Sequence, residues 1–79
     1  MAITTTTFRG LAFNVLVEEF HDRDTSGRLN GYLASIYRED RNTSARHLIR
    51  KSRLPGAADI MRQEIERDGI RAIRRLALG

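Results

Sequence analysis

Residues 22–27 (DRDTSG) place oxygen-bearing side chains at alternating positions ahead of a glycine. This spacing matches the first half of an EF-hand calcium loop, whose first, third and fifth positions supply ligands and whose sixth is Gly27. The loop also needs a bidentate carboxylate at its twelfth position, and Leu33 stands there. We therefore predict an Asx-type turn that does not bind calcium.

Groups suited to catalysis are sparse. His21 and His47 are the only imidazoles, and neither belongs to a pair at zinc-binding spacing or has a nucleophile at a suggestive position. There is no cysteine, and the six glycines do not form a phosphate-binding loop. The sequence predicts no catalytic residue, no metal site, no cofactor and no enzymatic activity.

Arginines are concentrated in the segment Arg38–Arg53. On a helix beginning near Thr43, Arg46, Arg50 and Arg53 would recur at i, i+4 and i+7 and form one stripe. Guanidinium groups could bind nucleic-acid phosphates or the carboxylates of a protein. No aromatic residue is interleaved with them, which argues against stacking on a single strand. A solvated helix face is the plainer alternative.

Phe13 and Val17 form a second candidate surface. If the segment around them is a helix, they lie beside its main apolar stripe, so apolar groups cover most of its circumference. Such a helix is either central in the fold or buried by another chain. Phe13 and Val17 are therefore our candidates for the apolar centre of a partner-binding site, with Arg46, Arg50 and Arg53 at its rim.

Apolar residues recur at helical spacing along the chain, and the helices that they predict would have to position these groups. Residues 1–7 are expected to be an extended or frayed lead-in, with Thr7 as an N-cap. Two amphipathic helices are then expected. The apolar positions that define them are Phe8, Leu11, Ala12, Val15, Leu16 and Phe20, and then Leu29, Tyr32, Leu33, Ile36 and Tyr37.

A β-hairpin is the alternative for this region. Leu11, Phe13, Val15 and Val17 also alternate as a strand would, and Gly10 and Asn14 weaken a helix. The alternative fold is α+β, with an N-terminal hairpin over residues 11–37 packed on two C-terminal helices.

The rest of the chain is expected to be helical. Asn42 or Thr43 could cap a third helix that ends before Pro55, and a fourth helix is interrupted or divided at Gly69. Our prediction is mainly α: a single domain over residues 1–79, built as a bundle of about four short helices. The expected core is Leu11, Val15, Leu16, Leu33, Ile36, Leu48, Ile49, Met61, Ile65 and Ile73.

Composition narrows the class of protein. The 79 residues carry a formal net charge of +4, and residues 28–53 hold most of the basic excess. A chain this short buries only about 60% of its unfolded surface, so a partner or self-association would help to stabilise it. The absence of cysteine, of a signal-like start and of a long apolar run predicts a cytoplasmic protein without membrane contact.

Together these features predict a small, basic, non-catalytic interaction protein. It would be an adaptor, inhibitor or accessory subunit that docks on a larger protein or nucleoprotein complex through an apolar patch rimmed by arginines. The alternative is a DNA- or RNA-binding regulator that uses Arg38–Arg53 on phosphates. Homo-oligomer formation is left open.

Overall fold

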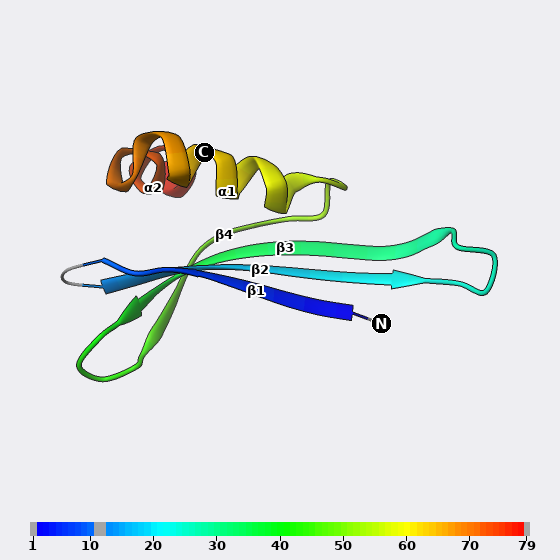
Figure 1. The fold of residues 1–79 in the computed structure, drawn as a ribbon, viewed down its shortest axis with the longest axis horizontal. Coiled ribbons are helices and arrows are strands. Elements are labelled where there is room, and N and C mark those ends of the chain that lie inside the picture. Colours follow the sequence, from blue (N-terminus) through cyan, green and yellow to red (C-terminus); the bar gives the residue numbers. More distant parts are fainter. Residues whose placement is uncertain (1, 11–12, 79) are drawn as a thin grey trace.

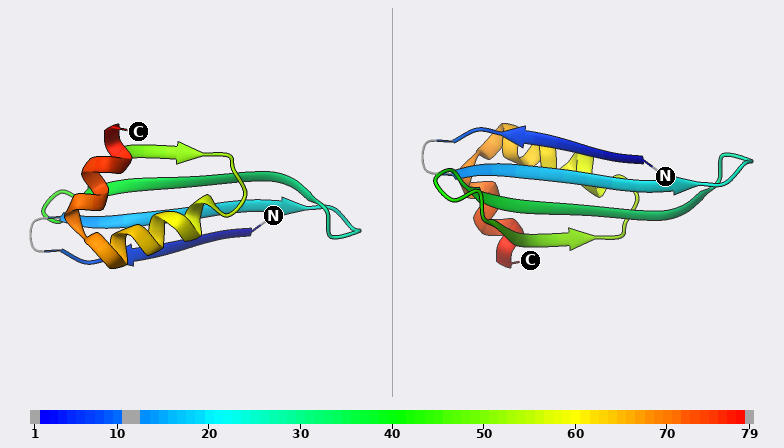
Figure 2. Two further views of the ribbon diagram at one scale, coloured as in Figure 1. Left: turned by 90° about the horizontal axis from the view of Figure 1, so that it is seen from above. Right: turned by 90° about the horizontal axis from the view of Figure 1, so that it is seen from below.

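The computed structural model describes residues 2–10 and 13–78 as one sheet covered by two helices (Figure 1). The elements, in order, are β1 (Ala2–Phe8), β2 (Phe13–Arg23), β3 (Leu29–Asp40), β4 (Arg46–Ser52), α1 (Ala57–Asp68) and α2 (Ile70–Leu78). The strands form an antiparallel meander in the order β1-β2-β3-β4. Both helices lie on the same face, and the other face is open (Figure 2).

The mainly helical prediction is wrong. About half of the chain is strand, and the fold agrees with the α+β alternative of an N-terminal hairpin packed on two C-terminal helices. The helix expected from Thr43 is instead a β3–β4 turn and strand β4, and Thr7 lies inside β1 rather than at a helix N-cap. The expected helix stripes fail because tertiary pairing overrides the weak intrinsic preference of these segments.

The β2–β3 hairpin is the centre of the sheet. Its register pairs Val15 with Arg38 and Val17 with Ile36. At its far end, Oδ1 of Asp24 accepts hydrogen bonds from the backbone N–H groups of Ser26 (3.0 Å) and Arg28 (2.9 Å). The predicted Asx-type turn is therefore present. It serves to reverse the chain between two paired strands.

Apolar side chains on both faces of the central strands explain the false helical pattern. Val15, Val17 and Ile36 are buried beneath the helices. Leu16 is only 4% exposed although strand alternation places it on the open face. A strand that is apolar on both faces presents neighbouring apolar residues, which also satisfy the i, i+3, i+4 template of a helix.

The two C-terminal helices agree with the sequence prediction. α1 buries its apolar stripe of Ala57, Ala58, Met61 and Ile65 against the sheet. Gly69, with a φ of +58°, divides α1 from α2. α1 packs over β2 and β3, and α2 packs over β4. In the described part of the chain, neither helix has the length and apolar character needed to cross a bilayer.

Most of the predicted core is buried or half-buried. The buried residues are Val15, Leu16, Ile36, Met61 and Ile65, and the half-buried ones are Leu33, Ile49 and Ile73. Leu48 is 52% exposed, contrary to the prediction, because it lies on an edge strand and faces away from the helices. Leu11 lies outside the described residues.

Candidate functional site

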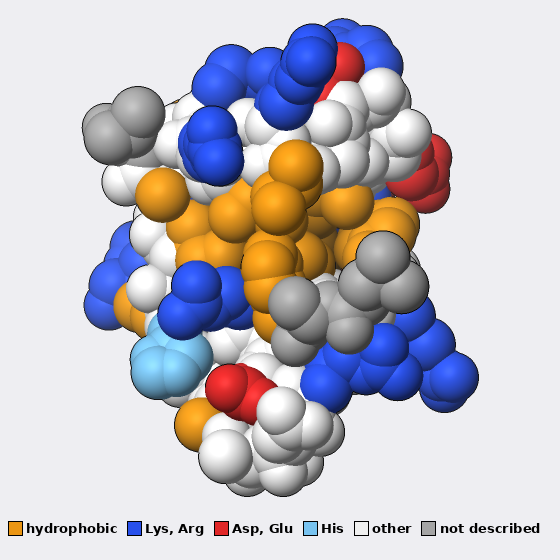
Figure 3. All heavy atoms as spheres, turned by 90° about the vertical axis from the view of Figure 1, so that its left-hand side faces the viewer, with side chains coloured by type: hydrophobic (Ala, Val, Ile, Leu, Met, Phe, Trp, Pro, Cys, Tyr) orange, Lys and Arg blue, Asp and Glu red, His pale blue; other side chains and the backbone are white. Residues whose placement is uncertain are grey.

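An apolar hollow lies at one end of the molecule, where the β1–β2 end of the sheet meets the α1–α2 corner (Figure 3). Its volume is about 370 Å³. Phe8, Phe13 and Ile73 are half-buried in it, whereas Ile70 is 58% exposed. The residues that line it are Phe8, Arg9, Gly10, Phe13, Val15, Ile65, Gly69, Ile70 and Ile73.

A glycine brings the sheet side of the hollow together. A Cβ atom at Gly10 would lie 2.5 Å from the carbonyl oxygen of Phe13, closer than any side chain permits. The backbone N–H of Gly10 donates to Oδ1 of Asn14 at 3.4 Å, and Arg41 donates to the carbonyl oxygen of Gly10 at 2.8 Å. Because Gly10 lacks a side chain, the ends of β1 and β2 can approach and hold the two phenylalanines in one wall.

A second glycine forms the helical side. The backbone N–H of Gly69 donates to the carbonyl oxygen of Ile65 at 2.8 Å and ends α1, and the positive φ of Gly69 redirects the chain into α2. Arg75 donates to Asp68 across this corner at 2.6 Å and holds the pKa of that carboxyl below its usual range. The corner presents Ile65 and Ile70 to the phenylalanines.

Positive charge borders the hollow. Arg9 lines it, and the guanidinium of Arg38 lies 5.6 Å from the centroid of the Phe13 ring, within cation–π range. α2, whose Ile70 and Ile73 line the hollow, also carries the exposed Arg71 and Arg74 and contains no acidic residue. In Figure 3, Lys and Arg side chains lie above and below the apolar surface.

The hollow is suited to binding rather than to proton transfer. Among its lining residues the ionisable side chain is that of Arg9, and a guanidinium offers hydrogen-bond donors but no acceptor for a proton. The remaining lining side chains are apolar, apart from the two glycines. Such a site can bury apolar groups and attract carboxylates around them.

Only part of the predicted partner-binding set meets at this site. Phe13 lines the hollow, whereas Val17 is 0% exposed in the core between sheet and helices. Arg46 and Arg50 are exposed on β4, and Arg53 follows it. These three do not form the expected helical stripe, because the segment is a strand and a loop. Arg46 instead pairs with Glu39 at 3.4 Å.

Arg9, Phe8 and Ile70 line the hollow but were not among the site residues predicted from the sequence. Phe8 pairs with Val15 in the β1–β2 ladder, so it shares a face with Phe13, two residues along the strand. Two phenylalanines flanking Gly10 would have indicated such a site if the hairpin had been preferred. Ile70 could not have been linked to them, because the α1–α2 corner approaches β1 only in the tertiary fold.

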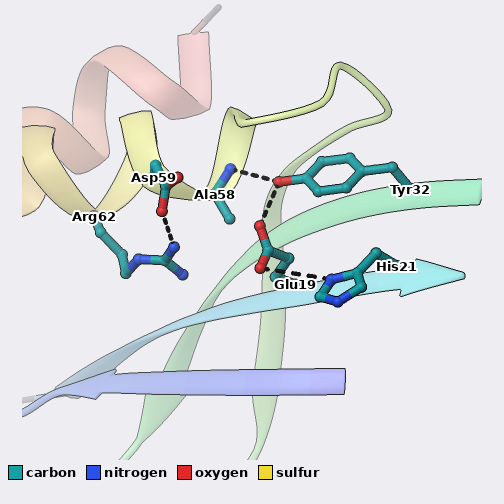
Figure 4. A network of polar contacts seen from close by, with 6 residues as sticks. All are labelled: Glu19, His21, Tyr32, Ala58, Asp59 and Arg62. Carbon is teal, nitrogen blue, oxygen red and sulfur yellow. Dashed lines mark hydrogen bonds and ion pairs between the residues drawn. The ribbon is translucent and has the colours of Figure 1, made fainter. Parts of the chain in front are cut away.

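A polar network beneath α1 brings several ionisable side chains together (Figure 4). The hydroxyl of Tyr32 donates to Oε2 of Glu19 at 2.9 Å and accepts from the backbone N–H of Ala58 at 3.0 Å. Nδ1 of His21 lies 3.8 Å from Oε1 of Glu19. The Tyr32 hydroxyl links the start of α1 to the sheet, so this network has a structural role.

Among the described residues, no group of three or more His, Asp or Glu side chains is placed to hold a metal ion. No protein-family model, curated protein or solved structure matches the chain.

Proposed function

We propose that this chain is a non-catalytic interaction protein that docks on a larger protein, or on the protein part of a nucleoprotein complex. The hollow receives apolar side chains from an acidic segment of that partner, and the surrounding arginines contact the acidic groups. We further propose the cytoplasm as its location, in keeping with the absence of cysteine. The observation that carries the proposal is an apolar concavity bordered by arginines.

Exposed apolar surface supports a macromolecular partner. Phe8 and Phe13 are half-buried and Ile70 is 58% exposed around one concavity, so their apolar surface remains in contact with water. Burial of apolar surface contributes about 25 cal/mol per Å². Aromatic side chains in such concavities are typical anchors of protein interfaces, with arginines at or near the rim.

Charge selects an acidic partner. Arg9 borders the hollow directly, Arg38 is stacked on Phe13, and α2 carries Arg71 and Arg74. Opposite charge on a partner would increase the association rate and orient the encounter. Each guanidinium can also form a bidentate contact with a carboxylate.

The test uses a labelled amphipathic helical peptide with Leu and Phe on one face and Glu on the other. Ile70 and Ile60 are matched, because both are 58% exposed on helices and only Ile70 lines the hollow. We expect Ile70→Asp to weaken peptide binding about tenfold or more, as loss of an apolar interface contact does. Ile60→Asp, which changes charge equally, should leave binding within about twofold. Equal loss in both variants would contradict the proposal.

Nucleic-acid binding by the exposed cations of β4 and the following loop is the competing outcome. Phosphate-driven binding weakens steeply between about 50 and 200 mM salt, whereas an apolar interface changes little. A labelled DNA duplex and a labelled RNA should therefore bind more weakly than the peptide at the higher salt concentration. The opposite result would be DNA or RNA binding that is tighter than peptide binding, lost in Arg50→Ala and retained in Ile70→Asp. Nucleic-acid binding would then replace protein docking as the proposed function.

A further inference from the structure

The outer edge of β1 differs from the other edge of the sheet. Between Ala2 and Phe8 the strand has no charged residue and no proline, and most of its side chains are exposed. An edge strand of this kind offers unpaired backbone groups to another strand, a hazard that sheets commonly block with charge, proline or a bulge. β4, at the opposite edge, carries Arg46, His47, Arg50 and Lys51, and its pairing with β3 is irregular.

We propose that the chain forms a symmetric dimer in which β1 pairs antiparallel with β1 of a second copy and joins two sheets into one of eight strands. A two-fold axis places the same surface on both sides of the interface. Self-pairing of β4 would bring basic residues against basic residues. Self-pairing of β1 brings only threonine and apolar side chains together, so no like charges are opposed.

The register follows from the length of β1. An antiparallel pair centred on Thr5 engages all seven residues, with Thr5 opposite Thr5 and Ile3 opposite Thr7 of the second copy. Directly opposed residues share a face, so Ile3, Thr5 and Thr7 of both copies lie on the open face, away from the helices.

This register also aligns the apolar rows of the two open faces. Within one chain, Ile3 pairs with Phe20, which pairs with Leu33. Thr7 pairs with Leu16, which pairs with Tyr37. In the dimer, the row that begins with Ile3 in one copy lies end to end with the row that begins with Thr7 in the other copy. Ile3, 61% exposed in one chain, then gains a neighbour on its outer side.

Two measurements test the dimer and its register. Sedimentation of the unmodified chain over a concentration series should give a mass rising from 9.0 kDa toward twice that value. Because the chain has no cysteine, a single introduced cysteine can form a protein–protein disulfide only with another copy. In the proposed register Thr5→Cys should cross-link readily in a glutathione buffer, since directly opposed Cβ atoms are about 5 Å apart.

Two matched variants supply the controls. Thr7→Cys lies on the same strand and face, but the two copies of that position would be ~14 Å apart, and it should stay uncross-linked. Lys51→Cys lies at the opposite edge of the sheet, in the same cross-strand row as Thr5, and should also stay uncross-linked. A mass of 9.0 kDa at every concentration would overturn the dimer. Cross-linking that is no faster at Thr5 than at the two control positions would overturn the interface.

Discussion

The hydroxyl of Tyr32, in the middle of the sheet, accepts a hydrogen bond from the backbone N–H of Ala58, in the first turn of α1, at 3.0 Å. The residue at the helix N-cap is Gly56, which makes no side-chain capping bond. Tyr32 therefore satisfies, from the sheet, one of the N–H groups that a Ser or Asp cap would normally satisfy. The same hydroxyl donates to Glu19, which ties two strands and a helix together.

Replacement of Tyr32 by Phe should lower the free energy of unfolding by about 1–3 kcal/mol. The change removes both hydrogen bonds, leaves the buried Ala58 N–H without its partner and takes one donor from the partly buried Glu19 carboxylate. Urea denaturation measures the effect. Tyr37→Phe is the matched control on the same strand and should change stability by less than about 0.5 kcal/mol.

Stability should fall at alkaline pH because of the same hydroxyl. Burial raises the pKa of Tyr32 above its usual value of 10.0, the Ala58 N–H lowers it, and Glu19 raises it again, with a net increase. The folded state therefore holds this proton more tightly than the unfolded chain. The contribution is complete below the unfolded pKa and is lost as pH rises through the folded one. Unfolding free energies measured from about pH 9 upward should show this decline, and Tyr32→Phe should show a smaller one.

Gly69→Ala should destabilise the fold by about 1–2 kcal/mol, because a φ of +58° disfavours any residue with a Cβ atom. It should also weaken binding in the hollow, since Gly69 sets the corner that positions Ile70. The control is Gly31→Ala, whose φ is not positive and whose Cβ would make an ordinary 3.8 Å contact with Phe20. Thermal melts should show the control unchanged or slightly stabilised. Equal melting temperatures for the two variants would contradict the strain argument.

The contact between Arg38 and Phe13 should contribute about 0.5–1 kcal/mol, as exposed cation–π pairs do. A double-mutant cycle with Arg38→Ala and Phe13→Leu isolates it from the effects of the single changes. We expect a coupling energy of that size in urea denaturation. A parallel cycle with Arg50→Ala in place of Arg38→Ala should give no coupling, because Arg50 lies on β4.

Local chemistry was readable from the sequence wherever neighbours in the chain decide the structure. Asp24 and Gly27 specified a turn, because a short acidic side chain bonds to N–H groups within four residues and glycine accepts a positive φ. The stripe of Met61 and Ile65 specified α1, and Gly69 marked where that helix would be interrupted or divided.

The candidate site was only partly readable. Phe13 was predicted to bind a partner because it lay outside the main apolar stripe of the expected helix, and it does line the hollow. Arg46, Arg50 and Arg53 were assigned to its rim on helical spacing, which β4 does not have. Arg9 lines the hollow instead, together with Phe8 and Phe13.

Only the tertiary structure decided between helix and strand for β2 and β3. Val15, Leu16 and Val17 are all buried, Val15 and Val17 beneath the helices and Leu16 on the other face of β2. Consecutive apolar residues satisfy both the helical and the strand template, so periodicity could not separate them. The strand pairing that settles the choice brings together residues such as Val17 and Ile36, which lie far apart in the chain. Pairing of that kind depends on the whole sheet, so the alternation of Phe13, Val15 and Val17 did not by itself exclude a helix.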